Sequence, residues 1–308
     1  MSLISAQQVT RAGSWVKHSP RRGSVVRSVR ARSVVNASAA MTNLKGCPTL
    51  HSVWKVPKAD EAAVDAIWKS HEKWMTETHT HGTAGKDDER PRLLKFYIAK
   101  GKELNDPMNP ESGETGMLLY TMSEVYAAPE GIGAHFKLGD SWPDMAKIME
   151  GIGKYGHFIE VGACQVITAM EDEAKPMITA KGQPTIHAVF KVPAAEEAAF
   201  DAMFKSHEEF MRKTHTMNPT GDDSKAPRLS SFFIAKGTEL NDPMNPEGGA
   251  TGNILYVMAE TYYAPSGIAG HFAQAEAGFK EFPQLMGYIP TYGHFMENGA
   301  CQVFTTFG

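Results

Sequence analysis

Cysteine is scarce in this chain of 308 residues, which has only Cys47, Cys164 and Cys301. Three cysteines cannot build a disulfide framework, and none of them has the C-x-x-C spacing of a zinc site. Long apolar runs are also missing, since none approaches the roughly 18 residues that a membrane helix needs. The net charge of -4 supplies no positive excess for nucleic acid. These absences argue against a disulfide scaffold, a membrane span and a nucleic-acid partner.

Acidic residues are absent before Asp60, whereas residues 1–46 contain six Arg, two Lys and eight Ser. An Arg- and Ser-rich segment without acidic residues is typical of an organelle transit peptide. The small residues at 35–40 resemble the cleavage region of plastid transit peptides. We therefore predict a chloroplast or other plastid location, with the mitochondrion as the alternative. A disordered basic tail is the second interpretation of residues 1–46.

The rest of the sequence contains one unit twice. Pro48–Phe136 aligns with Pro184–Phe272 without a gap, with 54 identities in 89 positions. Glu103–Glu111 recurs unchanged as Glu239–Glu247, and its Asn, Asp and Pro residues are typical of a turn that could cover a pocket or an edge strand. The predicted divisions are a first repeat at 47–170, a linker at 171–183 and a second repeat at 184–308.

Periodicity within one repeat predicts the order β-α-β-β-α-β, a ferredoxin-like α+β fold. Such a sheet has two helices on one face, so two repeats can pack their open faces together. We therefore predict tandem ferredoxin-like repeats that form an intrachain dimeric α+β barrel, with further homo-oligomerisation open. His51 and His187 face its interior and can meet near the pseudo-twofold axis. In the first repeat the strands are expected at 51–56, 93–99, 117–126 and 158–169, and the helical regions at 59–78 and 129–154.

A short motif follows the third expected strand of each repeat. Glu124-Val125-Tyr126 ends this strand, and Pro129 then begins a helix that carries His135. Glu260, Tyr262, Pro265 and His271 occupy the same places in the second repeat. This arrangement resembles the antibiotic-biosynthesis-monooxygenase family of dimeric α+β barrels. The resemblance covers both repeats and implies small, mostly apolar pockets between each sheet and its helices.

Ten of the twelve histidines form five matched pairs between the repeats. His71 lies seven residues after Val64 and four before Met75, so it falls on the apolar face of the first helix, and His207 is its counterpart. A partly buried histidine there suits proton abstraction from a phenol or quinol, and a core histidine bonded to a strand carbonyl is the alternative. His79 and its counterpart His215 are expected to act as cations at the helix carboxyl ends.

Glu124 and Glu260 fall on the mostly apolar face of their strands. A buried carboxylate needs a partner there, and the candidates for Glu124 are His71, His135 and Tyr97, with Arg92 in a purely structural interpretation. The candidate catalytic residues are therefore His71, His207, Glu124, Glu260, His135 and His271, and the candidate substrate-binding residues are Tyr120, Tyr256, Tyr97, Trp68 and Phe204.

The family resemblance implies a cofactor-independent monooxygenase, or a related oxidoreductase, that acts on a small aromatic, phenol or quinol. We expect no metal and no resident cofactor. Two alternatives stay open. One is a non-catalytic plastid protein that binds a small hydrophobic or tetrapyrrole ligand such as haem, and the other is a structural or interaction protein with closed pockets. The expected partner is a small hydrophobic or aromatic molecule.

Overall fold

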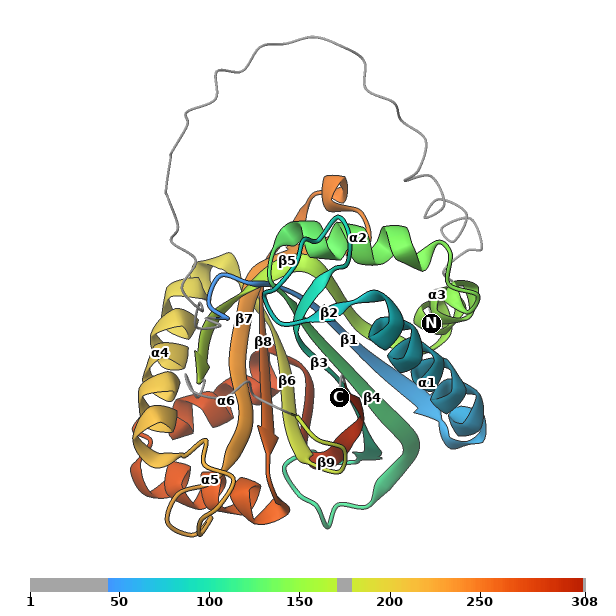
Figure 1. The fold of residues 1–308 in the computed structure, drawn as a ribbon. Coiled ribbons are helices and arrows are strands. Elements are labelled where there is room, and N and C mark those ends of the chain that lie inside the picture. The colour runs from blue at the N-terminus through green and yellow to red at the C-terminus, as the bar shows by residue number, and fades with distance from the viewer. Residues whose placement is uncertain (1–43, 171–178, 307–308) are drawn as a thin grey trace, which may run out of the picture. The chain divides into compact units, whose positions relative to one another are not determined.

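The computed structural model describes residues 44–170 and 179–306, which belong to one compact unit (Figure 1). The transit-peptide and plastid predictions rest largely on residues outside these ranges and stay predictions. Most of the predicted linker at 171–183 also lies outside the described residues. The first half contains β1 (Pro48–Pro57), α1 (Glu61–Thr78), β2 (Thr80–His81), β3 (Arg92–Leu104), β4 (Glu114–Tyr126), α2 (Pro129–Gly139), α3 (Met145–Tyr155) and β5 (Gly156–Met170). The second half contains β6 (Pro184–Pro193), α4 (Glu197–Thr214), β7 (Leu229–Leu240), β8 (Ala250–Tyr262), α5 (Pro265–Gly278), α6 (Phe282–Tyr292) and β9 (Gly293–Thr306).

Eight of the strands form a closed antiparallel barrel. They lie side by side in the order β3-β4-β1-β5-β7-β8-β6-β9, and β9 pairs with β3 to close it. The two halves meet where β5 pairs with β7 and where β3 pairs with β9. The short strand β2 adds to the outside of β3 in parallel. The expected α+β barrel is therefore present within a single chain.

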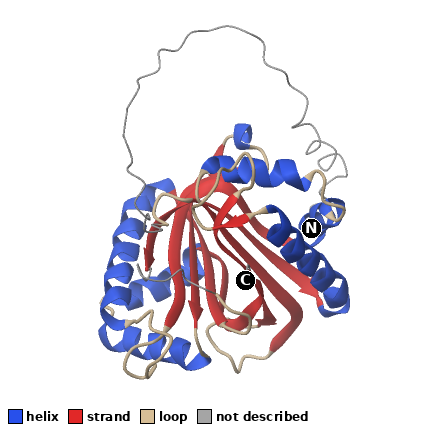
Figure 2. Cartoon of the chain, in the orientation of Figure 1, coloured by secondary structure: helices blue, strands red, loops and turns tan. Residues whose placement is uncertain are grey.

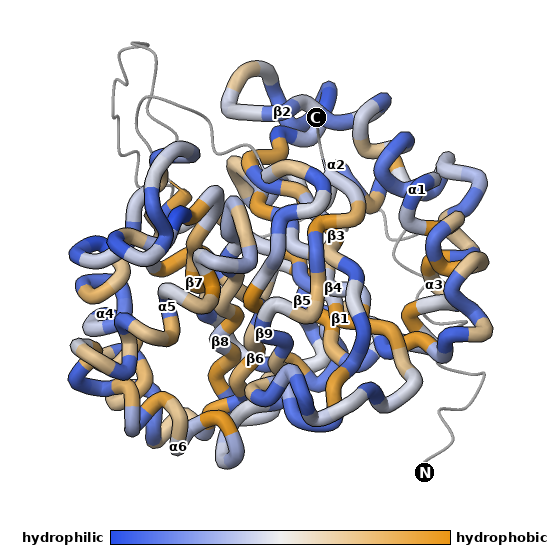
Figure 3. The backbone as a smooth tube through the Cα atoms, turned by 90° about the horizontal axis from the view of Figure 1, so that it is seen from below, coloured by the Kyte–Doolittle hydropathy of each residue, from blue (hydrophilic) through white to orange (hydrophobic). Residues whose placement is uncertain are grey.

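Helices cover the barrel on two sides. Figures 1 and 2 show α1, α2 and α3 along one side of the strands and α4, α5 and α6 along the other. Figure 3 shows the strands between these two groups from below. Helix α1 buries Val64, Trp68, His71, Trp74 and Met75, which recur at the spacing of one helical face. Among the described residues, no helix combines the length and the apolar character needed to cross a bilayer.

The helical region expected at 129–154 consists of two helices, α2 and α3. The break between them contains Trp142 and Pro143. A proline disfavours helical geometry at the residue before it, which accounts for the interruption. The break matters for the site because it turns Trp142 inward, where its side chain is 7% exposed.

Glycine is required at the two junctions where the halves join. Gly101 of β3 pairs with Cys301, and an added Cβ would lie 2.0 Å from the carbonyl oxygen of Ala300. Gly237 of β7 pairs with Cys164, and its Cβ would lie 2.0 Å from the carbonyl oxygen of Ala163. Any side chain at either position would force the paired strands apart.

The barrel interior is apolar along much of its length and contains buried polar groups as well. The rings of His51 and His187 meet edge to face at a centroid distance of 5.7 Å, which confirms the expected meeting. Burial raises the pKa of Glu160 and of Glu297 to about 8, although each accepts hydrogen bonds. Tyr97 also lies in the interior, with the residues of β1 and β5 that face away from the helices.

Candidate functional site

A small cavity lies in the first half between the sheet and helices α1, α2 and α3. Its volume is about 50 Å³. Its titratable lining residues are His71 and His135. Most of the wall consists of aromatic and methionine side chains, which are Trp54, Trp68, Trp74, Phe136, Trp142, Met122, Met145, Met149 and Met244. Met244 comes from the second half, in the loop that repeats the Asn-Asp-Pro-Met sequence, so this loop covers a pocket of the opposite half.

His71 is almost completely enclosed by aromatic rings. Its ring centroid lies 5.8 Å from that of Trp68 and 5.5 Å from that of Trp142. Among the described residues, no group offers a hydrogen bond to its Nδ1 atom. This excludes the strand-carbonyl interpretation for that nitrogen. Burial lowers the pKa of His71 to about 3, with a smaller contribution from His79, so the ring is neutral near pH 7.

A chain of hydrogen bonds leads from the cavity to a buried carboxyl group. His135 lines the cavity, and its Nδ1 lies 2.9 Å from the hydroxyl oxygen of Tyr126. The Tyr126 hydroxyl in turn donates to Oε2 of Glu124. Burial raises the pKa of Glu124 to about 8 and lowers the pKa of His135 well below its ordinary value. The second carboxyl oxygen of Glu124 has no hydrogen-bond partner among the described residues.

The tautomer of His135 follows from its other neighbours. The Thr78 hydroxyl donates its single proton to the carbonyl of Trp74, so it accepts a proton from Nδ1 of His79 at 2.9 Å. Nε2 of His79 therefore carries a lone pair, and it lies 3.1 Å from Nδ1 of His135. Nδ1 of His135 must then hold the proton, which leaves its Nε2 as the unprotonated nitrogen.

The second half repeats this arrangement around a smaller cavity of about 20 Å³, lined by His207, His271 and Phe279 among others. Nε2 of His215 lies 3.0 Å from Nδ1 of His271, and the Tyr262 hydroxyl donates to Glu260. Phe279 replaces the larger Trp142 of the first half. The two cavities therefore share their pair of histidines and differ in the size of their aromatic walls.

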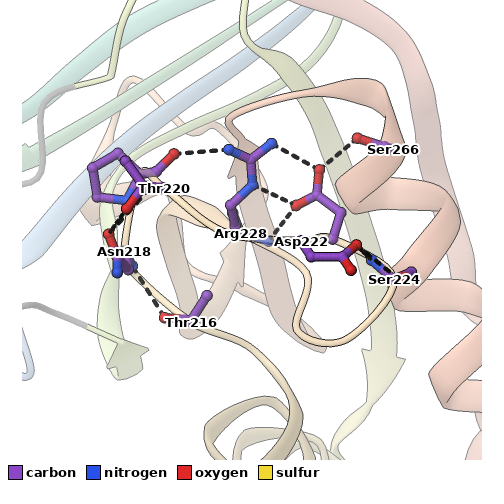
Figure 4. A network of polar contacts seen from close by, with 9 residues as sticks. Thr216, Asn218, Thr220, Asp222, Ser224, Arg228 and Ser266 are labelled. Carbon is purple, nitrogen blue, oxygen red and sulfur yellow. Dashed lines mark hydrogen bonds and ion pairs between the residues drawn. The ribbon is translucent and has the colours of Figure 1, made fainter.

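A loop network holds the second-half histidines in place. Arg228 contacts both carboxylate oxygens of Asp223, at 2.8 and 2.9 Å, and donates to the carbonyl of Pro219 at 2.7 Å (Figure 4). Ser266, in the first turn of α5, donates to Asp223. The arginine beside it lowers the pKa of Asp223 to about 2. This network ties the loop that follows His215 to the helix that carries His271.

The candidate substrate-binding residues are placed unevenly. Trp68 lines the first cavity as expected. Tyr120 and Tyr256 instead donate to Asp65 and Asp201, at 2.7 and 2.8 Å. The other two candidates also lie away from the cavities. Tyr97 is in the barrel interior, and Phe204 packs on Phe190 and Tyr256 in the core.

Of the candidate catalytic residues, His71 and His135 reach the first cavity and His207 and His271 reach the second. Glu124 is joined to this site through Tyr126 rather than through Tyr97 or Arg92, since Arg92 pairs with Asp87 at 2.6 Å. Sequence reasoning did not assign a role to Tyr126 or Tyr262, although each lies two residues after its glutamate and so on the same strand face.

The expected role of His79 and His215 as cations is wrong. Burial lowers the pKa of His79 to about 4 and the pKa of His215 to about 3, so both rings are neutral near pH 7. Each ring follows the last residue of its helix and bonds to the histidine of the next helical segment. The recurrence of this histidine in both repeats was the one feature of the sequence that could have indicated its role in positioning His135 and His271.

Comparison with known proteins finds similarity among solved structures only. No family model matches the chain, and no curated protein matches it. A putative monooxygenase from Fusobacterium nucleatum is 12% identical, with 85% of this chain and 94% of that chain covered and a TM-score of 0.46. An anthrone oxidase-like protein is 11% identical over 85% and 94%, with a TM-score of 0.47. A putative chlorite dismutase is 8% identical over 84% and 95%, with a TM-score of 0.37. Similarity at this level transfers no function to the chain.

Proposed function

We propose that this protein is an oxidoreductase that oxygenates a small electron-rich aromatic, a phenol, quinol or anthrone, in the cavity of the first half. The proposal includes membership of the antibiotic-biosynthesis-monooxygenase family as two tandem ferredoxin-like copies. It also includes a plastid location directed by residues 1–46. The observation that carries the activity is the position of the Tyr126 hydroxyl between His135, at the cavity wall, and the buried Glu124.

This chain of groups can take a proton from a substrate without leaving a charged imidazole behind. Nε2 of His135 accepts the substrate proton, Nδ1 passes its own proton to Tyr126, and the Tyr126 proton moves to Glu124. The low pKa of His135 opposes a lasting imidazolium, whereas the ionised carboxylate of Glu124, whose pKa is about 8, is the stronger base and takes the proton. The path therefore operates in the fraction of molecules in which Glu124 is ionised, which grows as the pH approaches 8. His71 lies beside this path and would bind a substrate hydroxyl through Nδ1, which has no hydrogen-bond partner among the described residues.

The deprotonated substrate then reacts with dioxygen, the only oxidant that the proposal requires. For a methylene group between aromatic rings, the balanced reaction converts CH₂ and O₂ to a carbonyl and one water. One oxygen atom enters the product, the other leaves as water, and the proton held by Glu124 returns to that water. The aromatic walls supply apolar contact for such a ring, which is the usual lining of small-molecule sites.

Substrate entry requires the cavity to widen. A cavity of about 50 Å³ is smaller than the roughly 150 Å³ that accommodates benzene in an engineered protein core. Met145, Met149 and Met244 line one wall, and methionine is the side chain best able to adapt its shape. The same volume is far below that of a tetrapyrrole site, so the proposed ligand is a small aromatic rather than haem.

The proposal is tested by comparing Tyr126→Phe with Tyr120→Phe. Both changes remove one tyrosine hydroxyl from β4, but Tyr120 bonds to Asp65 away from the cavity. We expect oxygen uptake by the full chain with a panel of quinols and anthrones, and incorporation of one labelled oxygen atom from ¹⁸O₂. Tyr126→Phe should lower the rate by about 10²- to 10⁴-fold, the contribution of general acid–base catalysis. Tyr120→Phe should retain it.

Equal rates for the two variants would refute the proton path. No oxygen uptake with any compound, together with a raised melting temperature in the presence of one of them, would favour the non-catalytic binding protein. A fusion of residues 1–46 to a fluorescent protein tests the plastid proposal separately, and a cytosolic signal would refute it.

A further inference from the structure

Three ligating side chains converge in the second half, where two of them, His207 and His271, line the cavity of about 20 Å³. One ring nitrogen of His207, one of His271 and one carboxylate oxygen of Glu260 all lie within 4.8 Å of one another. All three side chains are buried, with 1%, 6% and 0% of their surface exposed. They come from α4, α5 and β8, so the fold alone brings them together.

Two of these side chains carry a potential ligand atom that has no hydrogen-bond partner among the described residues. Among the described residues, neither Nδ1 of His207 nor Oε1 of Glu260 has a hydrogen-bond partner. A buried polar atom left unpaired costs about 1–3 kcal/mol in general. Two such atoms on side chains that converge therefore point to an occupant that satisfies both.

The third ligand is held in the form that coordination needs. Thr214 donates its proton to the carbonyl of Phe210, so it accepts from Nδ1 of His215 at 2.8 Å. Nε2 of His215 then accepts from Nδ1 of His271 at 3.0 Å, which leaves the lone pair of His271 on Nε2. A histidine whose second nitrogen is fixed by a neighbour in this way is the usual arrangement at metal sites. Tyr262 fixes Glu260 similarly, through its other oxygen.

We propose that the second half binds one divalent first-row transition metal ion through His207, His271 and Glu260. Two imidazoles and one carboxylate form a donor set that suits Zn²⁺, Fe²⁺ or Co²⁺. A tetrahedral ion with bonds of 2.0–2.1 Å needs its ligand atoms about 3.4 Å apart. Because the three ligand atoms already lie within 4.8 Å of one another, each pair must approach by no more than about 1.5 Å to bind the ion. The cavity of about 20 Å³ fits one water-sized fourth ligand.

The first half has the same three residue types without this convergence. Among the described residues, His207, Glu260 and His271 are the one group of three such side chains whose ligand atoms all lie within 4.8 Å of one another. In the first half the Tyr126 hydroxyl contacts Nδ1 of His135 as well as Glu124, which binds these side chains into the hydrogen-bonded chain. The metal proposal concerns the other half of the barrel and does not rest on the proposed oxygenase function.

The test uses the full chain after removal of metal with a chelator and dialysis. We expect it to bind one Co²⁺ per chain, with the visible absorption of a low-symmetry Co²⁺ site, and one Zn²⁺ by elemental analysis and native mass spectrometry. Glu260→Gln and His207→Ala should each weaken Co²⁺ binding by at least about 100-fold. The matched variants Glu124→Gln and His71→Ala should keep the same stoichiometry and spectrum, because they alter the other cavity.

Stoichiometric Co²⁺ that survives both Glu260→Gln and His207→Ala would overturn the proposal, since the ion would then lie elsewhere. Absence of bound Co²⁺ and Zn²⁺ in the unaltered chain would overturn it as well. Circular dichroism of each variant shows whether it is folded. If His207→Ala is not, the near-isosteric Glu260→Gln variant and the unaltered chain still decide the question.

Discussion

Glu124 should make the protein less stable as the pH rises, and replacement by glutamine should remove that effect. The pKa of this buried carboxyl is raised from 4.5 to about 8. Between these two values the unfolded chain ionises Glu124 while the folded chain keeps it protonated. The stabilising contribution is therefore complete below pH 4.5 and is lost as the pH rises through 8. A shift of this size corresponds to about 5 kcal/mol of unfolding free energy.

The physical cause of the shift is burial without sufficient compensation. Glu124 has no exposed surface, and within residues 44–170 and 179–306 the Tyr126 hydroxyl is the one group that hydrogen-bonds to its carboxyl. A glutamine has nearly the same shape and can accept the same hydrogen bond from Tyr126 through its amide oxygen. Because the amide does not ionise, Glu124→Gln avoids the cost of placing a negative charge in this environment.

The assay is urea unfolding of the unaltered chain and of Glu124→Gln at pH 5, 6, 7, 8 and 9. We expect the unfolding free energy of the variant, relative to the unaltered chain, to rise by about 1.4 kcal/mol per pH unit up to about pH 8 and then to level off. Using the difference removes the matching contributions of Glu160 and Glu297. Glu111→Gln, in an exposed loop, is the control and should follow the unaltered chain. Parallel curves for the unaltered chain and Glu124→Gln would refute the reasoning.

Three further predictions concern the rate, the barrel and the cavity. The oxygenation rate of the unaltered chain should rise with pH to a plateau, with an apparent pKa of about 8, because the proton path needs ionised Glu124; a pH–rate profile flat from 6 to 9 would contradict this. Gly101→Ala should lower the thermal midpoint far more than Gly153→Ala, since a Cβ at Gly101 meets a backbone carbonyl at 2.0 Å and one at Gly153 meets nothing within 4 Å; calorimetry of both variants decides it. Trp142→Ala should cost about 3–5 kcal/mol of unfolding free energy and enlarge the first cavity, so that toluene raises the melting temperature of the variant more than that of the unaltered chain; equal shifts would show that Trp142 does not limit the cavity.

Periodicity was sufficient to place the residues of α1. Val64, Trp68, His71 and Met75 share one helical face, and that face is buried. The barrel was also predictable, because two similar halves, each with one uncovered sheet face, have an obvious way to cover both. What the spacing could not supply was the position of a residue along its strand. Tyr120 is on the same face as Tyr126, but it lies six positions earlier, about 20 Å along a strand.

The sequence did not show which face of its strand Tyr97 occupies. In β3, Phe96 and Ile98 face the helices and Tyr97 faces the barrel interior. Residues 93–99 are nearly all apolar, because both faces of this strand are buried, so no alternation shows which face is which. The hydrogen bonds that link His135 to Glu124 through Tyr126 could not be predicted from the sequence for a different reason. They depend on the distance between a helix and a strand, which only the folded chain sets.

The two halves argue for a division of tasks rather than for two copies of one site. Their polar residues correspond one to one, from Thr78 and Thr214 at the helix ends to Glu124 and Glu260 on the strands. Their aromatic walls do not, since the stacked pair Trp74 and Trp142 is replaced by Phe210 and Phe279. Smaller rings would by themselves leave more space, yet the second cavity is the smaller one. The metal proposal assigns one ion to this smaller cavity beside the second histidine pair, whereas the oxygenase proposal assigns an organic ring to the wider, tryptophan-walled cavity.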